Sequence, residues 1–242
     1  MEGEERDFLP RFLWFWSAPV LLAGFYLIRY LDLEFYLKWM EGERGVLENL
    51  TPLFLLPAVV CSLLLLRHRR VLSANWILGW FLLHGAGAFY FAGEEISWGQ
   101  HYFAWATPES VALLNDQNET NLHNMSSWLD QKPRLMLWLW AVTGGFFIPL
   151  LVAGGRLYLG GPRSWRYWIF PPRVCMVVGL LTGVVRIPEY LAFALGAVPP
   201  FPFDIRASEL QEVLLSLFLS FYLASVYRRA AELSGKHPKS DG

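Results

Sequence analysis

The chain has 242 residues, of which 55% are hydrophobic and only 17% are charged, and its net charge at pH 7 is −1. Long apolar runs with so few charges exclude an ordinary soluble domain, and the near-neutral balance gives no overall field that would attract a nucleic acid. The two cysteines, Cys61 and Cys175, lie inside apolar runs, which argues against a disulfide framework or a cysteine metal cluster. We therefore expect an all-α, polytopic membrane protein.

A membrane-crossing helix needs about 20 mostly apolar residues. In chain order, six segments meet this requirement: 12–31, 50–66, 72–92, 135–153, 174–197 and 210–226. The first is too long for a signal sequence and lacks a small-residue cleavage site, so we expect it to be retained as a span. The prediction is one helical domain over residues 1–229. An outward polar segment, 94–133, lies between spans three and four, and a disordered tail covers residues 230–242.

Basic residues gather in alternate loops, where they set the expected orientation. They follow spans two, four and six at Arg67, Arg69, Arg70, Arg156, Arg163, Arg166, Arg173, Arg228, Arg229, Lys236 and Lys239. The positive-inside rule then places both termini in the cytoplasm and the polar segment on the opposite side. Under this topology most of the acidic side chains near span ends fall at one membrane face.

The outward segment opens with Gly-Glu-Glu-Ile-Ser-Trp-Gly-Gln-His at residues 93–101. If the third span continues as a helix past Gly93, then Glu94, Ser97 and His101 lie on one stripe. A carboxylate, a hydroxyl and an imidazole on one face can relay protons or help to bind a metal. The alternative is an ordinary solvated helix end, although two acids there would oppose the helix dipole.

The tandem acids of this motif are expected to play different parts. Glu95 points away from the stripe, towards Arg186 or a second carboxylate. Adjacent acids at a membrane edge suit general acid or base chemistry, so either could be the base. The predicted catalytic set is Glu94, Glu95, Ser97 and His101.

A second polar motif, Glu-Thr-Asn-Leu-His, follows at residues 119–123. On a helix Glu119 and His123 are four residues apart, a spacing at which both can bind one metal ion. With His101 they form the predicted metal-binding set for a divalent cation such as zinc, which would activate a bound water. The alternative is a polar loop whose side chains cap neighbouring helices.

The fifth predicted span carries charges of its own. Arg186 and Glu189 are three residues apart, with Pro188 between them to kink the helix. A charged pair in a span suggests function, here an arginine that holds an anionic group such as phosphate, but a structural ion pair is equally consistent. The predicted substrate-binding residues are Arg186, Glu189, Gln100 and Asn121.

Three further positions carry structural expectations. Gly179 and Gly183 form a Gly-x-x-x-Gly pair, which indicates close helix packing. His84, in mid-span, is read as a packed, hydrogen-bonded histidine. Glu212 lies deeper in the sixth span than helix-dipole effects alone would explain.

The motifs at residues 93–100, 107–109 and 119–124 resemble the signature of a family of bacterial multi-pass membrane proteins. The resemblance implies a bacterial inner-membrane location and no particular activity. The pair Glu94-Glu95 is also distantly similar to the Glu-Glu-x-x-x-Arg motif of CAAX-type intramembrane proteases, although Gly99 stands at the arginine position. Ser97 and His101 are distantly similar to the first motif of alkaline ceramidase-like hydrolases, whose later His-x-x-x-His this chain lacks.

The residues favour a membrane-embedded hydrolase or transferase, with a metal as a candidate cofactor, that acts on a lipid or lipid-linked substrate at the non-cytoplasmic face. Membrane lipid is the expected partner, and no nucleic acid is expected. Two other hypotheses remain open. One is a scaffold or assembly subunit of a membrane complex, with the polar segment as its docking surface. The other is an ion or proton translocator that uses Glu95, Arg186 and Glu189.

Overall fold

The computed structural model describes residues 9–41, 45–109, 120–121 and 127–236, and every regular element in these ranges is helical. The elements are α1 (Arg11–Leu31), α2 (Leu33–Phe35), η1 (Tyr36–Met40), α3 (Val46–Leu64), η2 (Leu65–Val71), α4 (Asn75–Glu95), η3 (Ser97–Gly99), α5 (Gln100–Phe103), α7 (Ser127–Trp140), η5 (Ala141–Phe147), α8 (Ile148–Ala153), α9 (Trp165–Ile169), η6 (Arg173–Cys175), α10 (Met176–Val184), α11 (Ile187–Ala194) and α12 (Ala207–Lys236). The all-helical prediction is confirmed.

Within the described ranges, six helical segments are long and apolar enough to cross a membrane, as the sequence predicts. They cover Arg11–Leu31, Val46–Val71, Asn75–Glu95, Gln131–Ala153, Trp165–Ala194 and Ala207–Gly235. The fifth begins earlier than expected and is broken into α9, η6, α10 and α11. Its break before α11 adjoins Pro188, which occupies the first turn of α11, where a missing backbone N–H is tolerated.

The last helix extends beyond the predicted span. α12 continues to Lys236, so residues 230–236 are helical, whereas the sequence predicted a disordered tail from residue 230. Ala230 is fully buried, and the His68 Nδ1 atom lies 3.0 Å from the Ser234 hydroxyl. These contacts hold the final turns against η2, which explains why that stretch is ordered.

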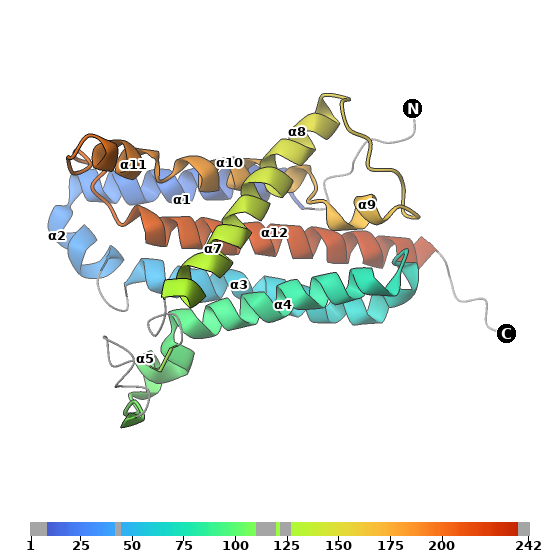
Figure 1. Cartoon of the computed structure of the whole chain (residues 1–242), viewed down its shortest axis with the longest axis horizontal. Helices are drawn as coiled ribbons and strands as arrows, with labels where there is room; N and C mark the ends of the chain where they lie inside the picture. Colours follow the sequence, from blue (N-terminus) through green and yellow to red (C-terminus); the bar gives the residue numbers. More distant parts are fainter. Residues whose placement is uncertain (1–8, 42–44, 110–119, 122–126, 237–242) are drawn as a thin grey trace.

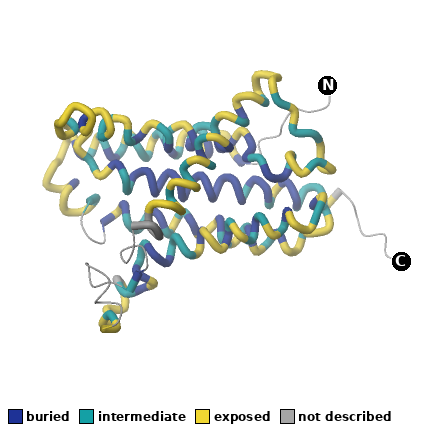
Figure 2. The backbone as a smooth tube through the Cα atoms, in the orientation of Figure 1, coloured by how far each residue is buried: buried dark blue, intermediate teal, exposed yellow. Residues whose placement is uncertain are grey.

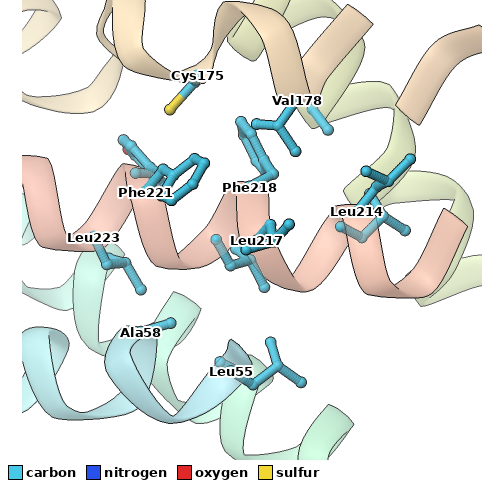
Figure 3. Close-up of a cluster of buried hydrophobic side chains, with 14 of the residues drawn as sticks. Leu55, Ala58, Cys175, Val178, Leu214, Leu217, Phe218, Phe221 and Leu223 are labelled. Carbon is cyan, nitrogen blue, oxygen red and sulfur yellow. The ribbon is translucent and has the colours of Figure 1, made fainter. Parts of the chain in front are cut away.

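α12 forms the centre of the bundle (Figure 1). Of its most apolar stretch 89% is buried, against 17% for α1. Figure 2 shows the buried positions concentrated along this helix, with exposed positions on the helices around it. In Figure 3, Leu55 and Ala58 of α3 lie on one side of α12, and Cys175 and Val178 lie on the other. α12 is therefore enclosed by protein, while the outer helices keep surfaces that lipid could cover.

Gly179 lets α10 approach its neighbour closely. A Cβ atom at this position would lie 2.7 Å from the Ala141 carbonyl oxygen and 3.0 Å from the Gly145 carbonyl carbon, both backbone atoms of η5. Backbone cannot move aside as a flexible side chain can, so only glycine fits. The close packing predicted from the Gly-x-x-x-Gly pair is confirmed.

Consecutive spans alternate in direction, which brings six helix ends together at one end of the bundle. These are the C-terminal ends of α1, α4 and α11 and the N-terminal ends of α3, α7 and α12 (Figure 1). We call this the acidic end because it carries Glu41, Glu48, Glu94, Glu95, Glu189, Asp204, Glu209 and Glu212. The opposite, basic end carries Arg67, Arg69, Arg70, Arg156, Arg163, Arg166 and Arg228.

Candidate functional site at the acidic end

The chain leaves α4 through a sharp left-handed turn. α4 ends at Glu95, and Ser97, Trp98 and Gly99 follow with φ values of 45°, 57° and 103°. A left-handed conformation at a residue other than glycine costs about 1 kcal/mol or more, and such strain often accompanies function. The helix does not continue through this turn, so Glu94, Ser97 and His101 do not share the helical stripe that the sequence suggested.

Trp98 folds back over the end of α4 and binds the first of the tandem acids. Its Nε1 atom donates a hydrogen bond of 2.7 Å to the Glu94 carboxylate. A Cβ atom on Gly93 would lie 2.8 Å from the Trp98 ring, so the absence of a side chain there makes room for the indole. Glu94 is only 4% exposed, and this contact places it inside the turn.

Ser97 and Asn121 form a buried contact beneath the turn. Asn121 Nδ2 donates a hydrogen bond of 3.1 Å to Ser97 Oγ, and both residues are almost completely buried. The contact joins the end of α4 to a residue 24 positions later in the chain. Two predicted site residues are thus brought together, and the strained backbone holds the Ser97 hydroxyl in place.

Gln100 forms hydrogen bonds to three other residues of this polar loop. Its Nε2 atom donates to the Trp105 carbonyl at 3.1 Å and to the Thr107 hydroxyl at 2.9 Å, and its Oε1 atom accepts from the Thr120 backbone N–H at 2.6 Å. The predicted substrate-binding role would compete with all three bonds. In this structure Gln100 organises the loop around Ser97.

Glu95 lies in a cluster of acids that come from separate helices. Its carboxyl interacts electrostatically with Glu212, Arg134, Glu209 and Glu48. Glu48 belongs to α3, Arg134 to α7, and Glu209 and Glu212 to α12. Of the two partners expected for Glu95, the second carboxylate is therefore present as Glu212. We call these five residues the acid cluster.

Arg134 is the cation within the acid cluster. It forms a salt bridge with Glu212, whose side chain is 7% exposed, while the Arg134 side chain is 31% exposed. The depth of Glu212, which the sequence singled out, is thus explained by an ion pair. Arg134 was not among the predicted site residues; the signal for it was a cation beside Pro133, at the start of a span that faces several acids.

A second set of charges surrounds the acid cluster at the same end. Arg206 forms salt bridges with Glu209 and, at 3.9 Å, with Glu41. Burial raises the pKa of the Glu41 carboxyl, and this increase is partly offset by Arg206 and Arg29. Arg29 is itself 6% exposed and donates to Asp204 at 2.5 Å. Loops and helices far apart in the sequence are therefore joined by charge at this end.

Arg186 and Glu189 form the pair that the sequence allowed. Arg186 Nε and Nη2 donate to the two Glu189 carboxylate oxygens at 2.8 Å and 2.7 Å. The guanidinium also lies 4.9 Å from the centre of the Tyr190 ring, within the range of a cation–π contact. Glu189 therefore occupies the side of Arg186 with which a bidentate anion would pair.

The predicted metal-binding side chains lie outside the part of the chain that the structure describes. Glu119, His123 and the side chain of His101 are not among the described groups, so their arrangement stays a prediction. Within the described ranges, no three His, Cys, Asp or Glu side chains are grouped so as to hold a metal ion. The acid cluster accordingly stands as a set of interacting charges.

Sequence reasoning also missed a buried polar junction on the broken fifth span. Gln211 Nε2 and Trp138 Nε1 donate to the Thr182 carbonyl at 3.0 Å and 3.3 Å. Thr182 lies one turn before the break in that span, where carbonyl groups need partners from other helices. His84, by contrast, behaves as expected: its Nδ1 atom is 2.8 Å from the Trp80 carbonyl oxygen, as in a packed, hydrogen-bonded histidine.

Six apolar spans in the described part of the chain, one of them the buried central helix α12, define a polytopic helical membrane protein. Comparison with known proteins finds no matching family model, no matching curated protein and no matching solved structure. The resemblance to the bacterial multi-pass family therefore stays a prediction, and the functional argument depends on the acidic end itself.

Proposed function

We propose that this protein is a membrane-embedded hydrolase or related transferase that acts on a lipid or lipid-linked substrate at its acidic end. One observation carries the proposal: the Glu95 carboxyl interacts electrostatically with Glu48, Glu209 and Glu212, with Arg134 as the cation within the group. A cluster with more acids than cations at the edge of an apolar bundle favours proton exchange. That property is what a general acid or base requires.

In this proposal each described residue of the site has a separate role. Glu95 exchanges a proton with the reacting group, and Arg134 holds the neighbouring carboxylates in position. Glu94 is bound by the Trp98 indole, so it supports the turn in preference to acting as the base. The Ser97 hydroxyl, held by Asn121 on a strained backbone, is the candidate nucleophile.

The remaining predicted roles are part of the same proposal. His101, Glu119 and His123 would hold a divalent metal such as zinc near the turn. Arg186 would exchange Glu189 for an anionic group of the substrate. The basic loops support an orientation with both termini in the cytoplasm of a bacterial inner membrane and the acidic end outside.

Turnover of lipid in labelled water tests the proposal. The full-length protein, reconstituted in vesicles of phosphatidylethanolamine and phosphatidylglycerol, is incubated in ¹⁸O-labelled water, and lipid products are followed by mass spectrometry. Hydrolysis adds the elements of one water across the broken ester bond, so one product carries the label. A transferase instead gives a new, unlabelled lipid.

The variant Glu95→Gln should lose about 10²- to 10⁴-fold in rate, as expected when a general acid or base is removed. Glu34→Gln is the matched control because Glu34 is an exposed acid at the same end of the bundle. Wild-type protein without lipid turnover, or Glu95→Gln with the control's rate, would contradict the proposal.

A scaffold or assembly subunit is the second candidate, and the pairing of charges favours it. Arg134 with Glu212, Arg186 with Glu189, and Arg29 with Asp204 satisfy one another inside the chain, as in a structural bundle. The scaffold reading predicts a purified protein with no lipid turnover and no bound metal, which cross-links stoichiometrically to one partner in native membranes.

The translocator hypothesis makes a different prediction. It requires proton or ion flux in liposomes that is lost in Glu189→Gln, because Glu189 would lie on the route. Flux that persists in this variant removes Glu189 from the route.

A further inference from the structure

A cavity of about 380 Å³ opens at the basic end, far from the acid cluster. Its lining residues come from the end of η2, the η2–α4 connection, the α8–α9 connection and the last turns of α12. These segments lie at the same end of the bundle (Figure 1). The lining residues are Arg70, Val71, Ser73, Pro162, Arg163 and Leu233. Volumes from about 300 Å³ upward are typical of small-molecule sites in proteins.

The cavity presents two arginines to whatever enters it. Arg70 belongs to η2 and Arg163 to the α8–α9 connection; both are exposed, and neither forms a salt bridge within the described part of the chain. The Ser73 hydroxyl adds a neutral hydrogen-bonding group. Guanidinium groups pair with phosphate through parallel hydrogen bonds, so this lining favours a phosphate group.

The charged residues around the cavity are mainly positive. Among the described residues of the basic end, Glu232 is the one carboxylate, whereas arginines stand at positions 67, 69, 70, 156, 163, 166 and 228. Such a field attracts anions from solution and from the surface of an anionic membrane.

Exposed tryptophans indicate where the cavity lies relative to the bilayer. Trp76 and Trp165 are 54% and 46% exposed, and their ring centres are 6.2 Å apart. Each lies within three residues of a lining residue, Ser73 or Arg163, and at the end of an apolar span. Tryptophan concentrates at the level of lipid headgroups, so the cavity opens where headgroups are.

We propose that this cavity binds the phosphate headgroup of an anionic phospholipid. Arg70 and Arg163 hold the phosphate, Ser73 donates a hydrogen bond, and the acyl chains run along the apolar surface of the neighbouring spans. Val71 and Leu233 provide the apolar part of the lining, next to the glycerol of the lipid. The site is separate from the acid cluster and holds whether or not the protein is an enzyme.

Native mass spectrometry of the full-length protein in neutral detergent tests this site. The protein is titrated with phosphatidylglycerol, with phosphatidylcholine, and with sn-glycerol 3-phosphate as a free phosphate ester. Phosphatidylglycerol should bind more tightly than phosphatidylcholine. Removing each arginine, in Arg70→Gln and Arg163→Gln, should weaken phosphatidylglycerol about five-fold, and removing both should weaken it about 25-fold.

Two further variants separate the cavity from general surface charge. Arg156→Gln removes an exposed arginine from the same connection as Arg163 but outside the lining, and it should leave binding within about two-fold of wild type. Ser73→Trp fills the cavity while keeping every arginine, and it should abolish selective binding. Ser73 is exposed in a connection, so we expect this change to leave the helix packing intact.

Three outcomes would overturn the proposal. The first is equal binding of the two phospholipids. The second is a double variant that binds phosphatidylglycerol as well as Arg156→Gln does. The third is glycerol phosphate that displaces the lipid at equal concentration, which would assign the site to a soluble phosphate ester.

Discussion

Removal of Arg134 tests whether an ion pair holds the acidic end together. Arg134→Ala leaves Glu212, whose side chain is 7% exposed, without its cation. Loss of one partner from a buried pair costs about 3–5 kcal/mol. Because the Arg134 side chain is 31% exposed, water can replace part of the interaction, and we expect a loss of about 2–3 kcal/mol in the free energy of unfolding.

A double-mutant cycle that adds Glu212→Gln tests whether the Arg134–Glu212 ion pair causes this loss of stability. When Glu212→Gln is added to Arg134→Ala, the Glu212 charge that lost its cation is removed as well, so the double variant should be more stable than the sum of the single losses by about 1 kcal/mol or more. SDS-driven unfolding in mixed micelles, followed through the 12 tryptophans, measures each free energy. Arg156→Ala, an exposed arginine at the basic end, should change stability by less than about 0.5 kcal/mol. Additive losses within about 0.5 kcal/mol would refute the ion pair as the reason for the cost.

Three further predictions follow from local packing and burial. Gly179→Ala should destabilise the protein by about 1–3 kcal/mol because its Cβ would meet the η5 backbone. Gly79→Ala, with nothing within 4 Å, should be neutral or stabilising in the same unfolding titration. Trp98→Phe keeps the ring but removes the donor to buried Glu94, so it should cost about 1–2 kcal/mol; an unchanged unfolding midpoint would show that the indole bond is unimportant. Burial raises the pKa of Glu41 above 4.5, so the folded state binds this proton more tightly than the unfolded chain does. Stability from this group is present at low pH and is lost as pH rises through the folded-state pKa; Glu41→Gln should flatten the profile, and an identical profile would contradict this.

Hydropathy predicts the spans of this chain well because each crossing must satisfy its own backbone hydrogen bonds. It does not predict which span lies at the centre. α12 is almost wholly enclosed, with Ser216 and Ser225 fully buried, yet its sequence is no more apolar than that of α3. Lipid and protein interior are both apolar environments, so apolarity alone cannot distinguish a lipid-facing helix from a central one.

The acidic end could be predicted in outline from topology. The basic loops predict which helix ends lie on the cytoplasmic side, and this topology places the acids of separate spans at the opposite end of the bundle. The electrostatic interaction between Glu95 and Glu212 agrees with this prediction for these two residues. The turn at Ser97 and Trp98 could not be predicted, because neither residue type favours a left-handed backbone; Gly99 alone indicated a turn. Arg134 was overlooked since a single arginine near a span start resembles an ordinary interface residue.

The central claim is that carboxylates from separate helices meet in one cluster at the acidic end. A double-mutant cycle between Glu95→Gln and Glu212→Gln measures this most directly, with unfolding free energy as the readout. We predict a coupling energy of about 0.5–3 kcal/mol between these two positions. The control cycle of Glu95→Gln with Glu34→Gln should be additive. Additivity of Glu95 and Glu212 within about 0.5 kcal/mol would contradict the cluster and the chemistry proposed for it.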